Sequence, residues 1–162
     1  RADQKGKLSD KDFLEGLSTR MDHENQVDIM EAWCAMLDGF PREKFELLKN
    51  LSSDYRLFIL SNTNSLHQKH FENTIDHAFG WNNFAAIFDH IGYSHELGER
   101  KPDREAFLKL MREYDLEAQH TLFIDDTVEH VESAKNLGLI AIHYTGGKKL
   151  LDEIEPFLIT SS

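Results

Sequence analysis

Two adjacent carboxylates, Asp125 and Asp126, stand at the end of the short apolar run 122–124. Placing like charges side by side where a buried strand ends is unfavourable unless a cation compensates them. Mg²⁺ suits such a place, because it takes one or two protein carboxylates together with waters and phosphate oxygens. The pair therefore indicates Mg²⁺ as a cofactor, although two helix-capping carboxylates in a row are the plain structural reading.

Two further polar groups complete a candidate set. Ser61 and Asn62 follow the apolar run 57–60, and Lys101 lies in the segment GERKPDREAF. A serine hydroxyl with nearby amides can donate to phosphate oxygens, and a lysine can compensate both a phosphoryl group and a neighbouring carboxylate. With the two aspartates, this set fits phosphoryl chemistry, in which catalysis is mainly positioning and charge stabilisation.

The elements that must position these residues alternate between strand and helix. Apolar strands are predicted over 57–60, 88–93, 121–124 and 139–143, and helices over 66–75, 103–114 and 128–137. Such alternation predicts an α/β fold with a parallel, doubly wound, Rossmann-like sheet. Because ligands bind beyond the carboxyl ends of such strands, Ser61–Asn62 and Asp125–Asp126 stand at suitable places. The chain before this region has helical spacing instead, with helices expected over 25–37 and from Pro41 onward.

Composition limits the partners. The formal net charge of −11 argues against nucleic acid and anionic membranes, which are bound by clustered Lys and Arg. No apolar run approaches the roughly 20 residues of a membrane span. The single cysteine, Cys34, cannot form an internal disulfide, so a cytoplasmic location is expected. A small phosphorylated metabolite is the partner that agrees with these limits.

Three segments, FILSNT, ERKPDREAF and LFIDDTVEHVESAKNLGL, resemble the second, third and fourth motifs of the haloacid dehalogenase (HAD) superfamily, in its subfamily with a helical cap. The resemblance implies a partial cap over residues 1–42 and an α/β core over residues 43–162. The segment YSHELGERKP is also similar to cytoplasmic sugar-phosphate phosphatases of that subfamily, including α-D-glucose-1-phosphate phosphatases. A Mg²⁺-dependent phosphatase acting on a small phosphomonoester through an aspartyl-phosphate intermediate is therefore expected.

The resemblance also implies roles for the candidate residues. Ser61 would hydrogen-bond the transferring phosphoryl group with Asn62 beside it, and Lys101 would stabilise the nucleophile and the phosphoryl oxygens. Asp126 would be the direct Mg²⁺ ligand, and Asp125 would bind the ion directly or through water. His95 and His130 are expected near the mouth of the site, either touching substrate or simply at the surface.

The first family motif is missing. Members carry Asp-x-Asp after an apolar strand near the N-terminus, and its first Asp is the nucleophile. Asp10-Lys11-Asp12 does not fit, because the residues before it form no apolar strand and an amphipathic helix follows, so helix capping is the better interpretation. We therefore expect the nucleophile in a missing N-terminal segment and a core that lacks its central first strand; the chain begins with Arg1, not Met.

Three alternatives stay open at this point. A 2-haloacid dehalogenase uses the same type of nucleophile without a metal, so the acidic pair favours the phosphatase. A response-regulator receiver also combines an acidic pair, a hydroxyl and a lysine, but its acidic pair comes first in the chain. The third alternative is a non-catalytic HAD-like interaction protein that has lost its nucleophile.

Overall fold

The computed structural model describes residues 40–158, and the chain divides into two compact units, Arg1–Glu99 and Arg100–Ser162. The helix predicted over 25–37 lies outside the described residues. The predicted cap over 1–42 also lies outside the described residues, apart from its last three residues. It therefore stays a prediction.

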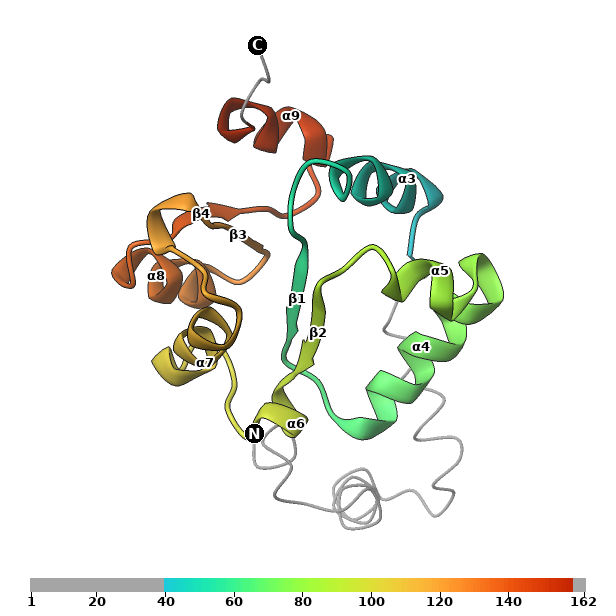
Figure 1. Cartoon of the computed structure of the whole chain (residues 1–162), viewed down its shortest axis with the longest axis horizontal. Coiled ribbons are helices and arrows are strands. Elements are labelled where there is room, and N and C mark those ends of the chain that lie inside the picture. The colour runs from blue at the N-terminus through green and yellow to red at the C-terminus, as the bar shows by residue number, and fades with distance from the viewer. Residues whose placement is uncertain (1–39, 159–162) are drawn as a thin grey trace. The chain divides into compact units, whose positions relative to one another are not determined.

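The first unit contains one pair of parallel strands. Its elements are α3 (Arg42–Leu51), β1 (Phe58–Ser61), α4 (Ser65–Phe79), α5 (Trp81–Ala85), β2 (His90–Tyr93) and α6 (Ser94–Leu97). Strands β1 and β2 run side by side in parallel (Figure 1). Phe58 pairs with His90 and Ser61 pairs with Tyr93. The carboxyl ends of the two strands therefore lie at the same edge, as the alternation of strands and helices predicted.

An aromatic cluster forms the core of this unit. Phe45, Ile75, Phe84 and Ile87 are buried, and Phe84 has no exposed surface. Phe84 meets the rings of Phe40 and Phe71 edge-on, at centroid distances of 5.5 and 5.8 Å. Burial of these rings supplies the main driving force for packing α3, α4 and α5 against the strands.

The second unit repeats the arrangement. Its elements are α7 (Arg104–Tyr114), η2 (Ala118–His120), β3 (Leu122–Asp125), α8 (Val128–Asn136), β4 (Ile140–His143), α9 (Leu150–Ile154) and η3 (Glu155–Phe157). Strands β3 and β4 lie side by side in parallel (Figure 1). Asp125 pairs with His143 at their carboxyl ends. Buried Phe107 on α7 packs edge-on against Phe123 of β3, at a centroid distance of 5.2 Å.

The strands are less covered than their apolar sequences predicted. Every residue of β1 and β3 is half-buried, although a continuous apolar run is typical of a strand buried on both faces. In the described part of the chain, the four strands form two separate two-stranded sheets. A strand with a single strand neighbour keeps more of its surface exposed than a strand inside a larger sheet. Among residues 40–158, no helix is both long and apolar enough to cross a membrane.

Candidate functional site

A buried ion pair occupies the carboxyl end of β3. The ammonium of Lys101, three residues before α7, donates to Oδ2 of Asp125 at 2.6 Å. Only 9% of the Lys101 side chain and 7% of the Asp125 side chain are exposed. The ammonium also lies 5.4 Å from the centroid of the Phe123 ring, within the range of a cation–π contact. Of the residues predicted for the site, the structure thus brings Lys101 and Asp125 into direct contact.

The second oxygen of Asp125 is also occupied. Its Oδ1 accepts the backbone N–H of Thr127 at 2.9 Å and lies 2.9 Å from Nδ1 of His130. Thr127 is the N-cap residue of α8, so the carboxylate sits at the positive end of that helix. An ionised carboxylate only accepts hydrogen bonds, and Nδ1 of His130 must therefore carry the hydrogen.

The contact of His130 with Asp125 is one that the sequence did not reveal. This histidine was expected at the mouth of the site, but the structure places it against Asp125 with only 12% of its side chain exposed. The available signal was its position five residues after Asp125, in the first turn of the predicted helix. That spacing allows a side chain near a helix start to reach back to a preceding carboxylate.

The environment of Asp125 lowers its pKa. Burial by itself raises the pKa of this carboxyl, but the hydrogen bond and positive charge of Lys101 outweigh that effect, and the Thr127 N–H and His130 add to it. The pKa consequently lies below its ordinary value. Asp125 is therefore ionised at neutral pH in the folded protein.

This shift predicts acid-sensitive stability. Because the folded pKa of Asp125 lies below the unfolded one, its contribution is fully present above the unfolded pKa and disappears as the pH falls through the folded pKa. We expect the free energy of unfolding, measured with urea between neutral and acidic pH, to fall more steeply for the wild type than for Asp125→Asn. Parallel curves for the two proteins would contradict this assignment.

Asp126 differs from its neighbour in exposure. Its side chain is exposed. Within residues 40–158, its carboxylate accepts a single hydrogen bond, a long one of 3.3 Å from the Thr127 hydroxyl to Oδ1. The backbone carbonyl of Asp126 lies 2.9 Å from Nε2 of His143 on β4, which anchors the main chain there. The two adjacent aspartates thus differ: the Asp125 carboxylate is buried and accepts hydrogen bonds on both oxygens, whereas the Asp126 carboxylate faces solvent.

Ser61 and Asn62 lie at the carboxyl end of β1, in the first unit. The residues that follow them are buried, and fully buried Ser94 holds this turn. The Ser94 hydroxyl accepts the N–H of Thr63 and donates to its carbonyl, both at 3.1 Å. Asn64 is the N-cap residue of α4, and its side chain accepts the N–H of His67 at 2.9 Å. The grouping of Ser61 and Asn62 with Lys101 and the aspartates stays a prediction.

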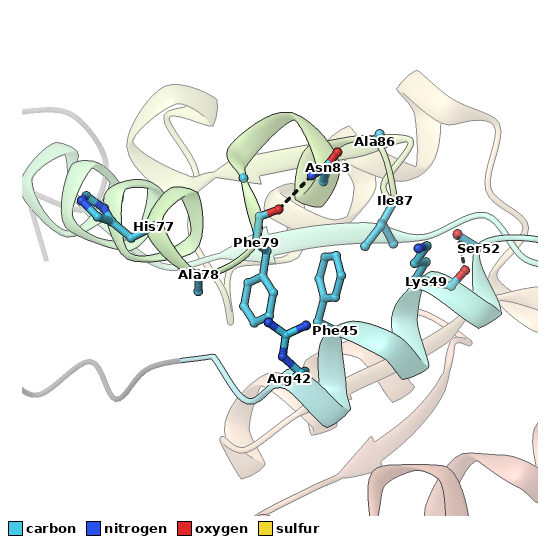
Figure 2. A pocket seen from close by; sticks show the side chains of 11 residues that line it. Arg42, Phe45, Lys49, Ser52, His77, Ala78, Phe79, Asn83, Ala86 and Ile87 are labelled. Atoms are coloured by element: carbon cyan, nitrogen blue, oxygen red, sulfur yellow. Dashed lines mark hydrogen bonds between the residues drawn. The ribbon is translucent and has the colours of Figure 1, made fainter.

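A surface hollow of about 610 Å³ lies elsewhere in the first unit. Figure 2 shows side chains around it that come from α3, from α4 and from α5 with the turn after it. Phe45 and Phe79 stack at its base with a centroid distance of 4.5 Å, and Arg42 lies over the Phe79 ring. None of the predicted site residues lines this hollow, so it belongs to the packing of the helices rather than to the predicted site.

The parallel strands joined by helices, with polar side chains at the strand ends, define a Rossmann-like α/β protein. The model of the haloacid dehalogenase-like hydrolase family matches residues 5–138, and the chain belongs to this family. This membership confirms the resemblance seen in the sequence and rules out the receiver alternative.

Two of the relatives that the chain resembles are phosphatases. The D-ribitol-5-phosphate phosphatase of Bacteroides thetaiotaomicron is 24% identical over 156 residues, which cover 96% of this chain and 75% of the relative. The sesquiterpene phosphatase astK of Aspergillus oryzae is 37% identical over 59 residues, which span 36% of this chain and only 30% of that protein. The segment matched to the drimenol cyclase drtB of Aspergillus calidoustus spans 17% of that protein.

Solved structures give the same fold. A wild-type HAD family enzyme from Bacteroides thetaiotaomicron, in complex with magnesium and inorganic phosphate, matches with a TM-score of 0.84 at 25% identity, over 94% of this chain and 77% of that one. A predicted HAD-like hydrolase from Porphyromonas gingivalis matches with a TM-score of 0.80 at 27% identity, over 96% of this chain and 76% of that one.

Proposed function

We propose that the protein is a Mg²⁺-dependent phosphatase that hydrolyses a small phosphomonoester, with a sugar or polyol phosphate as the substrate class. The observation that carries the proposal is the strand end at β3, where a buried Lys101–Asp125 pair adjoins the exposed carboxylate of Asp126. Such an edge offers a fixed positive charge to an incoming phosphate and an oxygen ligand to a magnesium ion. The ribitol-5-phosphate phosphatase supports the substrate class.

The proposed roles follow from what each side chain contacts. Lys101 supplies a positive charge toward the phosphoryl oxygens, and Asp125 holds its ammonium in place. Ser61, with Asn62 beside it, donates hydrogen bonds to the phosphoryl group from the end of β1. Because Asp125 already receives donors on both oxygens, Asp126 is the carboxylate proposed to contact the metal directly.

The described residues fit a magnesium ion that is only partly held by protein. Within residues 40–158, no group of three or more His, Cys, Asp or Glu side chains is placed to hold a metal by itself. Mg²⁺ often binds through one or two carboxylates, several waters and the substrate phosphate, which is what the exposed Asp126 allows. When bound, the ion would supply positive charge that neutralises the phosphoryl oxygens.

The proposal requires a carboxylate nucleophile that forms the aspartyl-phosphate intermediate. The first-motif pattern is not found within these 162 residues, so we propose that a preceding segment supplies it. In that arrangement residues 1–42 are part of the cap and residues 43–162 are the core without its first strand. The cytoplasm remains the proposed location, on the basis of the single Cys34.

Asp126→Asn tests the metal assignment. We expect the hydrolysis of p-nitrophenyl phosphate by the native protein in Mg²⁺ to fall by about 100-fold or more, since even the outer partners of a metal site are worth roughly 10–100-fold. Isothermal titration of Mg²⁺ into the protein with inorganic phosphate present should show a matching loss of affinity. Glu129→Gln, which removes an exposed charge three residues away on α8, is the matched control and should behave as the wild type. Unchanged turnover and Mg²⁺ affinity in Asp126→Asn would refute the assignment.

A further inference from the structure

We propose that His130 is a positioning residue that orients Asp125 and, through it, the Lys101 ammonium. This inference rests on the proposed function for its importance to phosphate binding, but the contact itself belongs wholly to the second unit. Its basis is the short contact between Nδ1 of His130 and Oδ1 of Asp125, 2.9 Å long, at a place where both side chains are nearly buried.

The argument begins with the torsional freedom of an aspartate. The carboxyl plane of Asp turns about a broad, soft torsion, so a single hydrogen bond does not determine its orientation. In this site the oxygens have different partners, with Lys101 on Oδ2 and the Thr127 N–H together with His130 on Oδ1. Donors on both oxygens restrict that rotation, and the His130 side chain supplies one of them.

The second step concerns where His130 itself is held. It lies in the first turn of α8, and its backbone N–H donates to the carbonyl of the N-cap residue Thr127 at 3.1 Å. The imidazole therefore reaches back from a rigid helix to the carboxylate that precedes that helix. A donor on a rigid element positions its partner more accurately than one on a flexible loop.

The third step connects His130 to chemistry. Lys101 has a flexible four-carbon stem, and its ammonium is useful only if it stays in one place. The 2.6 Å bond to Asp125 helps to hold it there, and His130 and the Thr127 N–H together hold Oδ1 of Asp125. His130 thus acts on the Lys101 ammonium through Asp125.

Two amide substitutions separate this role from general packing. In His130→Asn the side-chain N–H₂ lies close to the position of the imidazole Nδ1, whereas in His130→Gln it lies one methylene further out, near the position of Nε2. We expect His130→Asn to keep the Lys101 ammonium ordered, observed as a slowly exchanging lysine NH₃⁺ signal by NMR, and His130→Gln to lose that signal. His120→Ala, at an exposed histidine of the same unit, is the control and should leave it unchanged.

Binding provides the second measurement. Inorganic phosphate affinity in Mg²⁺ should fall by about 10-fold in His130→Gln and stay close to wild type in His130→Asn, the loss being typical of an outer partner of a metal site. Equal behaviour of the two variants in the NMR signal would overturn the positioning role, whether both keep it or both lose it. If the wild type binds no phosphate while the NMR signals still separate the two variants, the proposed function fails and the positioning role stands.

Discussion

Replacing Lys101 with methionine should lower the free energy of unfolding by about 3–5 kcal/mol, the usual cost of removing one partner of a buried ion pair. The variant leaves the Asp125 carboxylate, 7% exposed, without its ammonium partner. Methionine keeps most of the length and apolar stem of lysine, so the loss reports the charge rather than a cavity. Urea unfolding followed by circular dichroism at neutral pH measures it.

A matched surface variant makes this result interpretable. Lys135 pairs with Glu132 at 3.5 Å on α8, but about half of each side chain is exposed. Lys135→Met should therefore change stability by no more than about 0.5 kcal/mol, because water screens such pairs. Equal effects at Lys101 and Lys135 would show that burial of the first pair has no energetic consequence.

The double variant Lys101→Met/Asp125→Asn tests the source of the loss. Asparagine removes the buried negative charge while its oxygen can still accept from Thr127 and His130. We expect the double variant to be more stable than the sum of the two single changes predicts, by more than about 1 kcal/mol, because contacting residues are not additive. Strict additivity would mean that the two side chains do not interact.

The second large effect is expected at Phe84. Truncating this fully buried ring to alanine should cost about 3–5 kcal/mol, through lost apolar burial and the cavity that remains. Its ring lies against those of five other aromatic residues, at centroid distances of 5.1 to 6.4 Å: Phe40, Phe45, Phe71, Trp81 and Phe88. The same unfolding measurement, together with the thermal midpoint, determines the size of the loss.

Phe157→Ala is the control for this variant. Phe157 is 45% exposed, so its truncation should change stability by about 0.5 kcal/mol or less. A loss at Phe84 as small as that at Phe157 would mean that the aromatic cluster does not determine the stability of the first unit. Phe84→Leu should fall between the two, because leucine fills part of the space.

Much of the local structure was predictable because its causes lie close together in the chain. The four apolar runs became β1, β2, β3 and β4, with ends within two residues of the prediction. The start of α4 also has a local cause, because the side chain of its N-cap residue Asn64 accepts a hydrogen bond from His67, only three residues away. Membership of the hydrolase family could likewise be expected from three short motifs, because each motif is a local pattern at a strand or helix end.

What the sequence left open depends on groups far apart in the chain. It placed Ser61, Asn62, Lys101, Asp125 and Asp126 at strand ends or helix starts. Different roles for the two aspartates came only from the resemblance to the family, because residue type and position do not distinguish them. The bond from Lys101 to Asp125 joins residues 24 positions apart, and the Ser94–Thr63 contact joins residues 31 apart. Only tertiary packing brings such partners together, because hydrogen bonds of this kind depend on distance and direction in space and not on spacing along the chain.

The sequence by itself determined the fold class and the candidate residues. The tertiary structure decided that Asp125 is buried among Lys101, Thr127 and His130 and that Asp126 faces the solvent.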